Sequence, residues 1–247
     1  MRVVDEARAA VGLLTIVPVG RRALRAGSEQ GAALWLPVVG GLVGVVAAAA
    51  YGVGEALLGS TYGAALALTV SAVLTGGLHH DGLADTADGL GVRGDRTRRL
   101  AVMRDSGIGA FGALALVAFA LLATAALARL SPPQAAGALV AGHVLGRWAA
   151  LAQLAFVAPA RADGLGASFC ADRLAVAAGS VAALAIALVA SGIGAGLSAV
   201  AGAAVGAAAG IVLARRAVGG RTGDTLGAAV LLTEVAVYSV LSAYLVT

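Results

Sequence analysis

The residues best suited to chemistry are three aspartates in the stretch GGLHHDGLADTADGLG, which runs from Gly76 to Gly91. Asp81, Asp85 and Asp88 follow the spacing i, i+4, i+7, which places their side chains within roughly 60° of one another on a helix. Carboxylates gathered in this way repel one another unless a cation lies between them. Oxygen ligands suit Mg²⁺ or Mn²⁺, and Mg²⁺ is usually held by a few carboxylates together with substrate phosphates. The spacing therefore predicts a metal site for a phosphorylated substrate.

The same acids have a simpler interpretation as helix caps or solvated loop charges. Asp95, which precedes RTRRLAVMR, is better interpreted as a helix N-cap than as a metal ligand. For Asp85 and Asp88 this interpretation is weaker, because both lie beside an apolar segment, where a lone carboxylate is costly. His79 and His80 are weaker evidence than the aspartates, because histidines at a membrane boundary are often only interfacial.

Two further stretches, MRDSGIGAFG at 103–112 and GGRTGDTLGA at 219–228, also carry glycines and polar residues into apolar segments. Glycine-rich turns and helix N-termini bind anions through free backbone N–H groups. Each stretch alone is equally well explained as an ordinary helix start. Together with the aspartates they predict one composite site for a large phosphate ligand, with Glu234 pointing into it. The candidate site residues of the two stretches are Arg104, Asp105, Ser106, Thr222, Asp224 and Thr225.

The elements that must position these motifs are apolar. The chain of 247 residues is 60% hydrophobic and 12% charged, whereas a soluble domain carries about a quarter charged residues. About 20 apolar residues span a bilayer core. Hydropathy therefore predicts an all-α, polytopic helical bundle, forming a single membrane-embedded domain over 1–247. About seven spans are expected, at 32–58, 62–78, 108–129, 135–158, 174–192, 195–214 and 226–246.

Charge and cysteine content exclude other classes of protein. The net charge is +4 and all 17 basic residues are arginine, but a soluble nucleic-acid binder would carry more charge and less apolar sequence. We therefore expect no nucleic-acid partner. The lone Cys170 cannot form an intrachain disulfide and is best interpreted as a small buried residue. Asp5 and Glu6 interrupt the N-terminal stretch, which indicates an amphipathic helix rather than a signal peptide.

The arginines are distributed unevenly among the predicted connections. With seven spans, the arginine-bearing segments 21–25, 79–106, 159–173 and 215–221 all fall on one side of the membrane, and the opposite connections hold none, although Arg129 borders one of them. The positive-inside rule makes the arginine-rich side cytoplasmic. We therefore predict a multi-pass protein of the cell's inner (plasma) membrane, with a polar active-site cavity facing the cytoplasm.

In this order and at these intervals, the motifs GGLHHDGLADTADG, MRDSGIGAFG and GGRTGDTLGA resemble those of the cobalamin synthase (adenosylcobinamide-GDP ribazoletransferase) family of polytopic membrane proteins. The resemblance covers nearly the whole chain and includes SEQGAALWLPVVGGLVG, with Glu29 at the place of an acidic residue. After Ser106 the family commonly has arginine, and here Gly107 stands there. One phosphate contact is then missing or is supplied by another arginine such as Arg147.

The resemblance implies a reaction and its cofactor. The 5′-oxygen of α-ribazole, or of its 5′-phosphate, attacks the cobinamide-side phosphorus of adenosylcobinamide-GDP. GMP leaves, and adenosylcobalamin or its 5′-phosphate forms in the last steps of nucleotide-loop assembly. The implied cofactor is Mg²⁺, and the implied partners are these substrates and the lipid bilayer; a homo-oligomer is left open.

The resemblance also assigns roles to residues of this chain. His79 is implied to act as general base or to orient an aspartate, and it forms the catalytic set with Asp81 and Asp85. The implied metal ligands are Asp81, Asp85, Asp88, Asp105 and Asp224. The implied substrate-binding residues are Arg104, Ser106, Thr222 and Thr225.

Two other functions remain open at this point. A CDP-alcohol phosphotransferase also displaces a nucleoside monophosphate within a membrane bundle, but its signature needs an arginine after Ala84, where Asp85 stands. An ion-coupled transporter would place its acids near the middle of spans, whereas most acids here cluster at one face.

Overall fold

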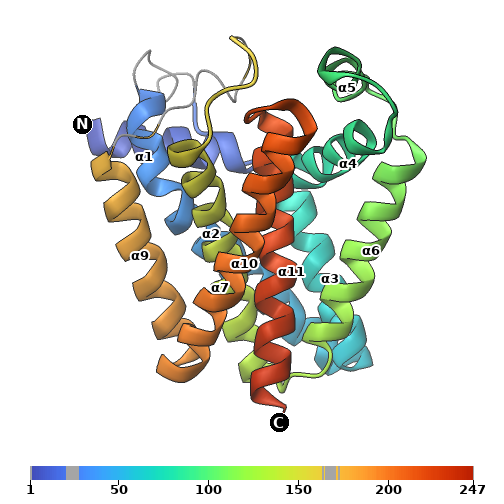
Figure 1. The fold of residues 1–247 in the computed structure, drawn as a ribbon. Helices are drawn as coiled ribbons and strands as arrows, with labels where there is room; N and C mark the ends of the chain where they lie inside the picture. Colours follow the sequence, from blue (N-terminus) through green and yellow to red (C-terminus); the bar gives the residue numbers. More distant parts are fainter. Residues whose placement is uncertain (1, 21–27, 163, 165–170, 172, 247) are drawn as a thin grey trace.

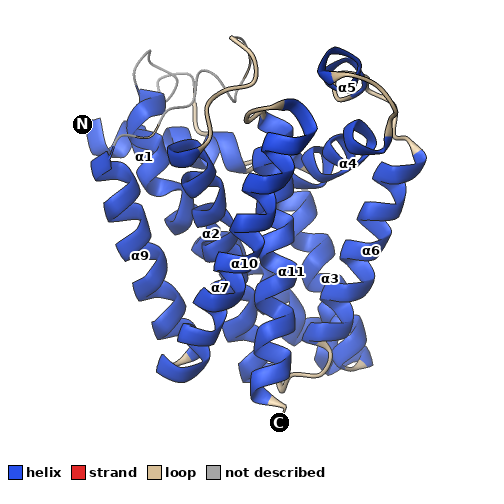
Figure 2. Cartoon of the chain, viewed as in Figure 1, coloured by secondary structure: helices blue, strands red, loops and turns tan. Residues whose placement is uncertain are grey.

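A computed structural model describes residues 2–20, 28–162, 164, 171 and 173–246 of the chain. Every regular element within these residues is an α-helix, and the helices run side by side as a bundle (Figures 1 and 2). The predicted all-α fold is therefore confirmed. The helices are α1 (Arg2–Leu14), α2 (Ser28–Leu58), α3 (Ser60–Leu74), α4 (Leu78–Gly91), α5 (Arg96–Val102), α6 (Ala110–Leu127), α7 (Pro132–Phe156), α9 (Arg173–Ser191), α10 (Ile193–Val218) and α11 (Gly223–Leu245).

The described helices make this a multi-pass membrane protein. Six of them, α2, α6, α7, α9, α10 and α11, are long and apolar enough to cross a bilayer, and the bent pair α3–α4 makes a seventh candidate. Large apolar side chains such as Leu114, Val189 and Val205 are exposed on the outer faces of these helices, as contact with lipid requires. The expected number of spans is thus confirmed, with one span broken.

The broken span differs from the prediction of a continuous helix over 62–78. Helix α3 ends at Leu74, and the chain then bends by 93° into α4. The bend needs Gly76 and Gly77, whose φ angles of 60° and 72° lie in the left-handed region that favours glycine. Helix α4 consequently lies across the end of the bundle, outside the helices that run along it (Figure 1).

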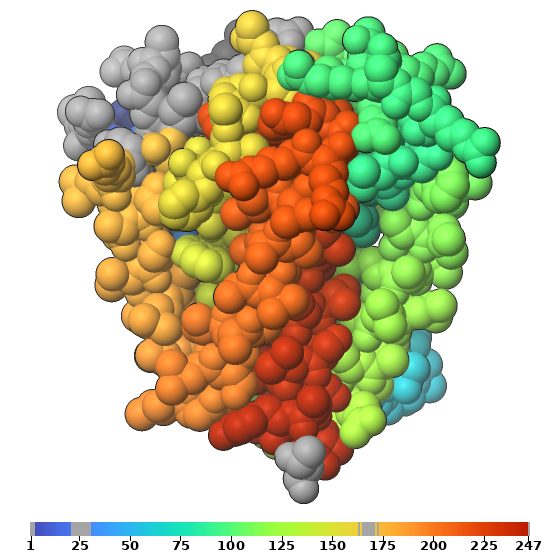
Figure 3. Space-filling view, viewed as in Figure 1, coloured from blue at the N-terminus to red at the C-terminus, as the bar shows by residue number. Residues whose placement is uncertain are grey.

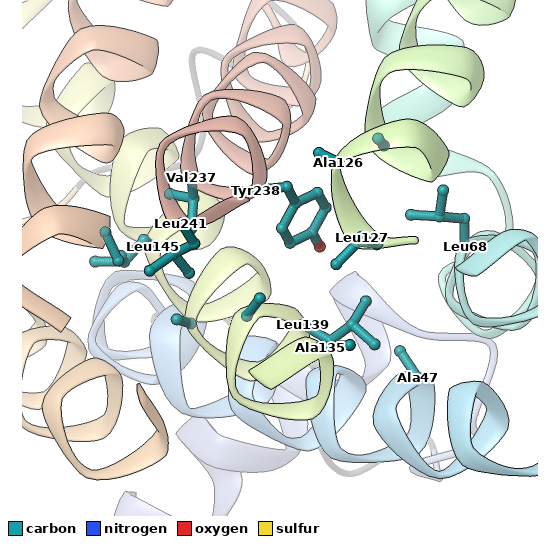
Figure 4. Close-up of a cluster of buried hydrophobic side chains, with 14 of the residues drawn as sticks. Ala47, Leu68, Ala126, Leu127, Ala135, Leu139, Leu145, Val237, Tyr238 and Leu241 are labelled. Carbon is teal, nitrogen blue, oxygen red and sulfur yellow. The ribbon is translucent and has the colours of Figure 1, made fainter. Parts of the chain in front are cut away.

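Helix α7 lies at the centre of the bundle and packs against α2, α9, α10 and α11. Glycines allow these close approaches, because small residues let helix backbones come near one another. A Cβ added to Gly44 of α2 would lie 2.7 Å from the Cα of Val140 in α7, and one added to Gly206 of α10 would lie 2.4 Å from the Cα of Thr233 in α11. Figure 4 shows part of the resulting core, where Tyr238 of α11 lies near Leu127.

One end of the bundle gathers the polar segments. Helices α1, α4 and α5 lie there, together with the turn between α10 and α11 (Figures 1 and 3). Arg96 donates from Nε to the carbonyl oxygen of Val218 at 2.6 Å, and Arg99 donates to that of Arg216 at 2.9 Å. These bonds attach α5 to the end of α10. Asp95 caps α5 by accepting from the N–H of Arg98 at 2.9 Å, which confirms its predicted role.

The predicted N-terminal helix is also present, and α1 packs against the start of α2. A Cβ added to Gly31 of α2 would lie 2.1 Å from Cδ of Glu6, so the two helices are in close contact. After α1, the N–H of Ile16 donates to the carbonyl oxygen of Leu74 at 2.9 Å, which joins α1 to the end of α3. The arginines at 21–25 and Cys170 lie outside the described residues.

Candidate active site

A cavity of about 240 Å³ opens among α1, α2, α4, α7 and α11 at the end of the bundle that gathers the polar segments. Its polar lining consists of His79 and Asp81 from α4, Arg147 from α7 and Asp224 from α11. The rest of the described lining is apolar or glycine. A concave, mostly apolar site with a few convergent polar groups is the usual form of a small-molecule site.

Two glycines bring the first and third motifs together at this cavity. A Cβ added to Gly82 of α4 would lie 2.7 Å from the carbonyl oxygen of Asp224, and one added to Gly227 of α11 would lie 3.2 Å from the Cα of His79. Contacts under 3.0 Å do not occur for real Cβ atoms, so any side chain at 82 would separate the helices. The motif glycines therefore place Asp81 and Asp224 in one cavity.

The start of α11 is built by the two threonines of the third motif. The Thr222 hydroxyl accepts from the N–H of Thr225 at 3.2 Å, and the Thr225 hydroxyl accepts from the N–H of Thr222 at 2.9 Å. The Thr222 hydroxyl also donates to Asp224 at 3.2 Å. Both hydroxyls thus hold the helix terminus, and that of Thr222 also holds the Asp224 carboxylate. Their substrate-binding role stays a prediction.

The three aspartates of α4 have different surroundings. Asp88 accepts with one oxygen from the N–H of Gly109 at 2.8 Å and with the other from the N–H of Gly112 at 2.9 Å, so it caps the start of α6. Asp81 lines the cavity. Asp85 is half-buried, and the Asp81, Asp224 and Asp88 carboxylates lie near it. This group of acids therefore favours a bound cation.

The protein's own side chains supply only part of the coordination shell that Mg²⁺ needs. Within the described residues, no three histidine, cysteine or acidic side chains are close enough together to hold a metal ion. Two carboxylates, Asp81 and Asp224, do line the same cavity. Mg²⁺ is commonly bound by one or two carboxylates, with waters and substrate phosphates completing its coordination. The residues thus fit a magnesium ion that the substrate helps to hold.

His79 is nearly buried, at 5% exposure, and it lines the cavity. Its Nε2 has no hydrogen-bond partner within the described part of the chain. The Arg147 guanidinium lies near it and lines the same cavity. His79 therefore has a ring nitrogen available to a ligand in the cavity.

A buried ion pair lies behind the cavity. Arg147, at 2% exposure, donates to Glu234 of α11, and Glu234 Oε1 also lies 2.8 Å from Nδ1 of His143. Glu234 was predicted to point into the cavity; this prediction is wrong, because its carboxylate is held by these two groups and only Arg147 lines the cavity. His143 is therefore a hydrogen-bonded residue of the interior. Buried ion pairs inside membrane bundles are costly and mark functional positions.

The second motif stands apart from the cavity. Arg104, with Arg161, lines a separate hollow beside α5. Ser106 is exposed, and Asp105 accepts from the N–H of Gly107 at 3.1 Å in a local turn. Among the described residues, these three do not line the cavity that contains Asp81. Their roles in binding metal or phosphate stay predictions.

A family model described as cobalamin-5-phosphate synthase matches residues 6–242, nearly the whole chain. The chain belongs to the cobalamin-5-phosphate synthase family. The suspected resemblance is thereby confirmed, and the match contains all three motifs, the cavity and the buried ion pair of this family member.

Individual relatives agree with the family model. An adenosylcobinamide-GDP ribazoletransferase of Bradyrhizobium diazoefficiens is 40% identical over 98% of this chain and 95% of its own length. Proteins of the same name from Mesorhizobium japonicum and Azorhizobium caulinodans are 39% and 40% identical, over 87% and 81% of this chain and 85% and 80% of their own lengths. No solved structure matches the chain.

Proposed function

We propose that this protein is a magnesium-dependent adenosylcobinamide-GDP ribazoletransferase. Its substrates are adenosylcobinamide-GDP and α-ribazole or α-ribazole 5′-phosphate, and its products are GMP and adenosylcobalamin or its 5′-phosphate. The observation that carries this proposal is the meeting of Asp81 and His79 from one motif with Asp224 from another in a single cavity, in a chain of this family.

In the proposed reaction, the ribazole 5′-oxygen forms a bond to the cobinamide-side phosphorus, and the bond from that phosphorus to the GMP oxygen breaks. His79 accepts a hydrogen bond from the attacking 5′-hydroxyl and takes its proton as the bond to phosphorus forms. Arg147 lies in the same cavity and attracts the diphosphate, while Glu234 and His143 hold its guanidinium in place. Asp81 and Asp224, with Asp85 nearby, would hold Mg²⁺, which would supply charge neutralisation for the diphosphate and for the departing GMP.

We place the cavity on the cytoplasmic side of the membrane. The end of the bundle with the cavity holds Arg93, Arg96, Arg98, Arg99, Arg104, Arg161, Arg173, Arg215, Arg216 and Arg221. Among the described connections at the other end, only the one between α6 and α7 holds an arginine, Arg129. The positive-inside rule supports the proposed orientation.

The test is turnover by the detergent-purified protein. Adenosylcobinamide-GDP and α-ribazole are supplied with Mg²⁺ or with excess chelator, and GMP and cobalamin are separated by chromatography. We expect both products in equal amounts, only with Mg²⁺. The absence of both products from protein that elutes as a folded species would contradict the proposal. Release of CMP from CDP-alcohols by the same sample would then favour the alternative phosphotransferase.

A further inference from the structure

The cavity has two chemically different sides. Asp81, Asp224 and His79 come from α4 and α11, at the side where the motif glycines bring these helices together. Helices α1, α2 and α7 contribute mainly leucines. The apolar wall is defined here as Leu13 and Leu14 of α1, Leu36 of α2, Leu154 of α7 and Val230 of α11.

The apolar wall is part of the packed interior. Leu14, Leu36 and Leu154 are each less than 7% exposed and belong to one hydrophobic cluster between α1, α2 and α7. Leucine and valine side chains offer no hydrogen bonds, and the helical backbone satisfies its own polar groups. A ligand group seated against this wall must therefore lack donors and acceptors that need partners, because burying them unpaired is costly.

The volume of the cavity limits the size of the ligand group that can bind against the apolar wall. Its volume of about 240 Å³ is slightly below the roughly 300–1,000 Å³ of pockets for drug-sized ligands. A fused two-ring heterocycle fits within this space. A corrin macrocycle with its side chains is far larger and has to remain outside the cavity.

We propose that the apolar wall binds the aromatic base of the acceptor nucleoside, the dimethylbenzimidazole of α-ribazole. The inference rests on the proposed function and assigns the acceptor to the cavity, with the corrin ring outside it. Of the three aromatic bases in the reaction, guanine and the adenine of the adenosyl group each have an edge of donors and acceptors that the wall leaves unpaired. Dimethylbenzimidazole is apolar apart from its ring nitrogens. Its ribose 5′-oxygen then extends toward His79, Asp81 and Asp224, where the diphosphate is attacked.

The proposal gives α1 a function in recognition. Leu13 and Leu14 occupy its last turn, and the bond from Ile16 to Leu74 fixes that turn beside the start of α4. One wall of the base site is thus formed by a helix that crosses no membrane. Replacing a leucine of the wall should therefore affect the acceptor substrate alone.

The experiment fills the site with Leu36→Phe and uses Leu42→Phe as the matched control. Leu42 is on the same helix but 59% exposed on its outer face. KM is measured for each substrate separately, and binding of α-ribazole is measured by calorimetry without corrinoid. We expect Leu36→Phe to raise KM and Kd for α-ribazole about 10-fold or more and to leave KM for adenosylcobinamide-GDP within about twofold, because overpacking costs about 1–3 kcal/mol. Leu42→Phe should change neither.

A second variant, Leu154→Ala, tests the same site if Leu36→Phe fails to fold. It enlarges the site, so it should turn over a ribazole analogue with a larger naphthimidazole base faster than the wild type does. If both wall variants behave like Leu42→Phe, or raise only the corrinoid KM, the base site is wrong although the proposed function stands. A lipid chain in the cavity would give the first of these results. If the wild type neither turns over nor binds α-ribazole, both proposals fail.

Discussion

Helix α4 carries Asp81 in its first turn and Asp88 in its last, and the two aspartates have different surroundings. Asp81 lines the cavity beside α11, whereas both oxygens of Asp88 accept backbone N–H groups at the start of α6. One stripe of carboxylates thus divides into an end that faces the cavity and an end that joins two helices. Even spacing along a helix therefore does not imply equal roles, because each turn meets a different neighbour.

The largest expected effect is at the first turn. Asp81→Asn should lower turnover by roughly 10²–10³-fold, the scale of losing one electrostatic group from an active site. The unfolding temperature should stay unchanged, because Asn preserves the shape of the side chain and no helix cap is lost. Product release and thermal unfolding of the same detergent sample measure the two quantities. Equal turnover of variant and wild type would refute the assignment of Asp81 to the metal.

At the last turn, the main effect should be on stability. Asp88→Ala removes the acceptor for Gly109 and Gly112, so the free energy of unfolding should fall by about 2–3 kcal/mol. Asp88→Asn keeps one acceptor oxygen and should lose about half as much. Denaturant unfolding followed by circular dichroism measures the change. A strict loss of turnover in Asp88→Asn at wild-type stability would instead favour the predicted metal role.

Two glycines test the same contrast between the ends of α4. Gly82→Ala brings a Cβ against the backbone of Asp224, so α4 and α11 must separate at a cost of about 1–3 kcal/mol and turnover should fall about 10-fold. The matched control is Gly89→Ala, whose Cβ would meet the side chain of Met103 at 2.6 Å and the nearest backbone atom, the carbonyl oxygen of Arg99, at an ordinary 3.5 Å. Because that flexible side chain can move, the control should keep its turnover. Similar losses of turnover in both variants would mean that α4 tolerates no substitution of its glycines, and that the contact with Asp224 is not the cause.

The smallest effect is expected just beyond α4. Asp95 caps α5, a short helix that contributes nothing to the described lining of the cavity. Asp95→Ala should therefore leave turnover and its Mg²⁺ dependence unchanged and lower stability by at most about 1 kcal/mol. Magnesium titrations of turnover compare it with the wild type. A shifted magnesium requirement would assign Asp95 to the metal site after all.

Much of the fold was predictable, because long apolar runs between arginine-bearing connections determine where helices cross a bilayer. The bend after α3 was not, because hydropathy continues through Leu74 and carries no information about the positive φ angles of Gly76 and Gly77. Asp95 was identified as a cap because a cap is a local feature, readable from the residues that follow it.

The site was predictable only as far as its parts are local. The motifs identified Asp81 and Asp224, but Asp88 depends on glycines more than 20 positions away, so its bonds to α6 could not be read from spacing. The ion pair between Arg147 and Glu234 joins two helices through residues that are 87 positions apart in the sequence. The one available signal was His143 and Arg147, four residues apart and therefore on one face of an apolar helix.

The end of α11 at Leu245 lies opposite the end of the bundle that holds the cavity (Figure 1). A protein captured on a sensor surface by a tag at that end presents its cavity to the flowing solution. Substrates as large as corrinoids can then reach every immobilised molecule without obstruction by the support. The same attachment in a supported bilayer orients all copies alike, so binding and turnover can be followed on one uniform face.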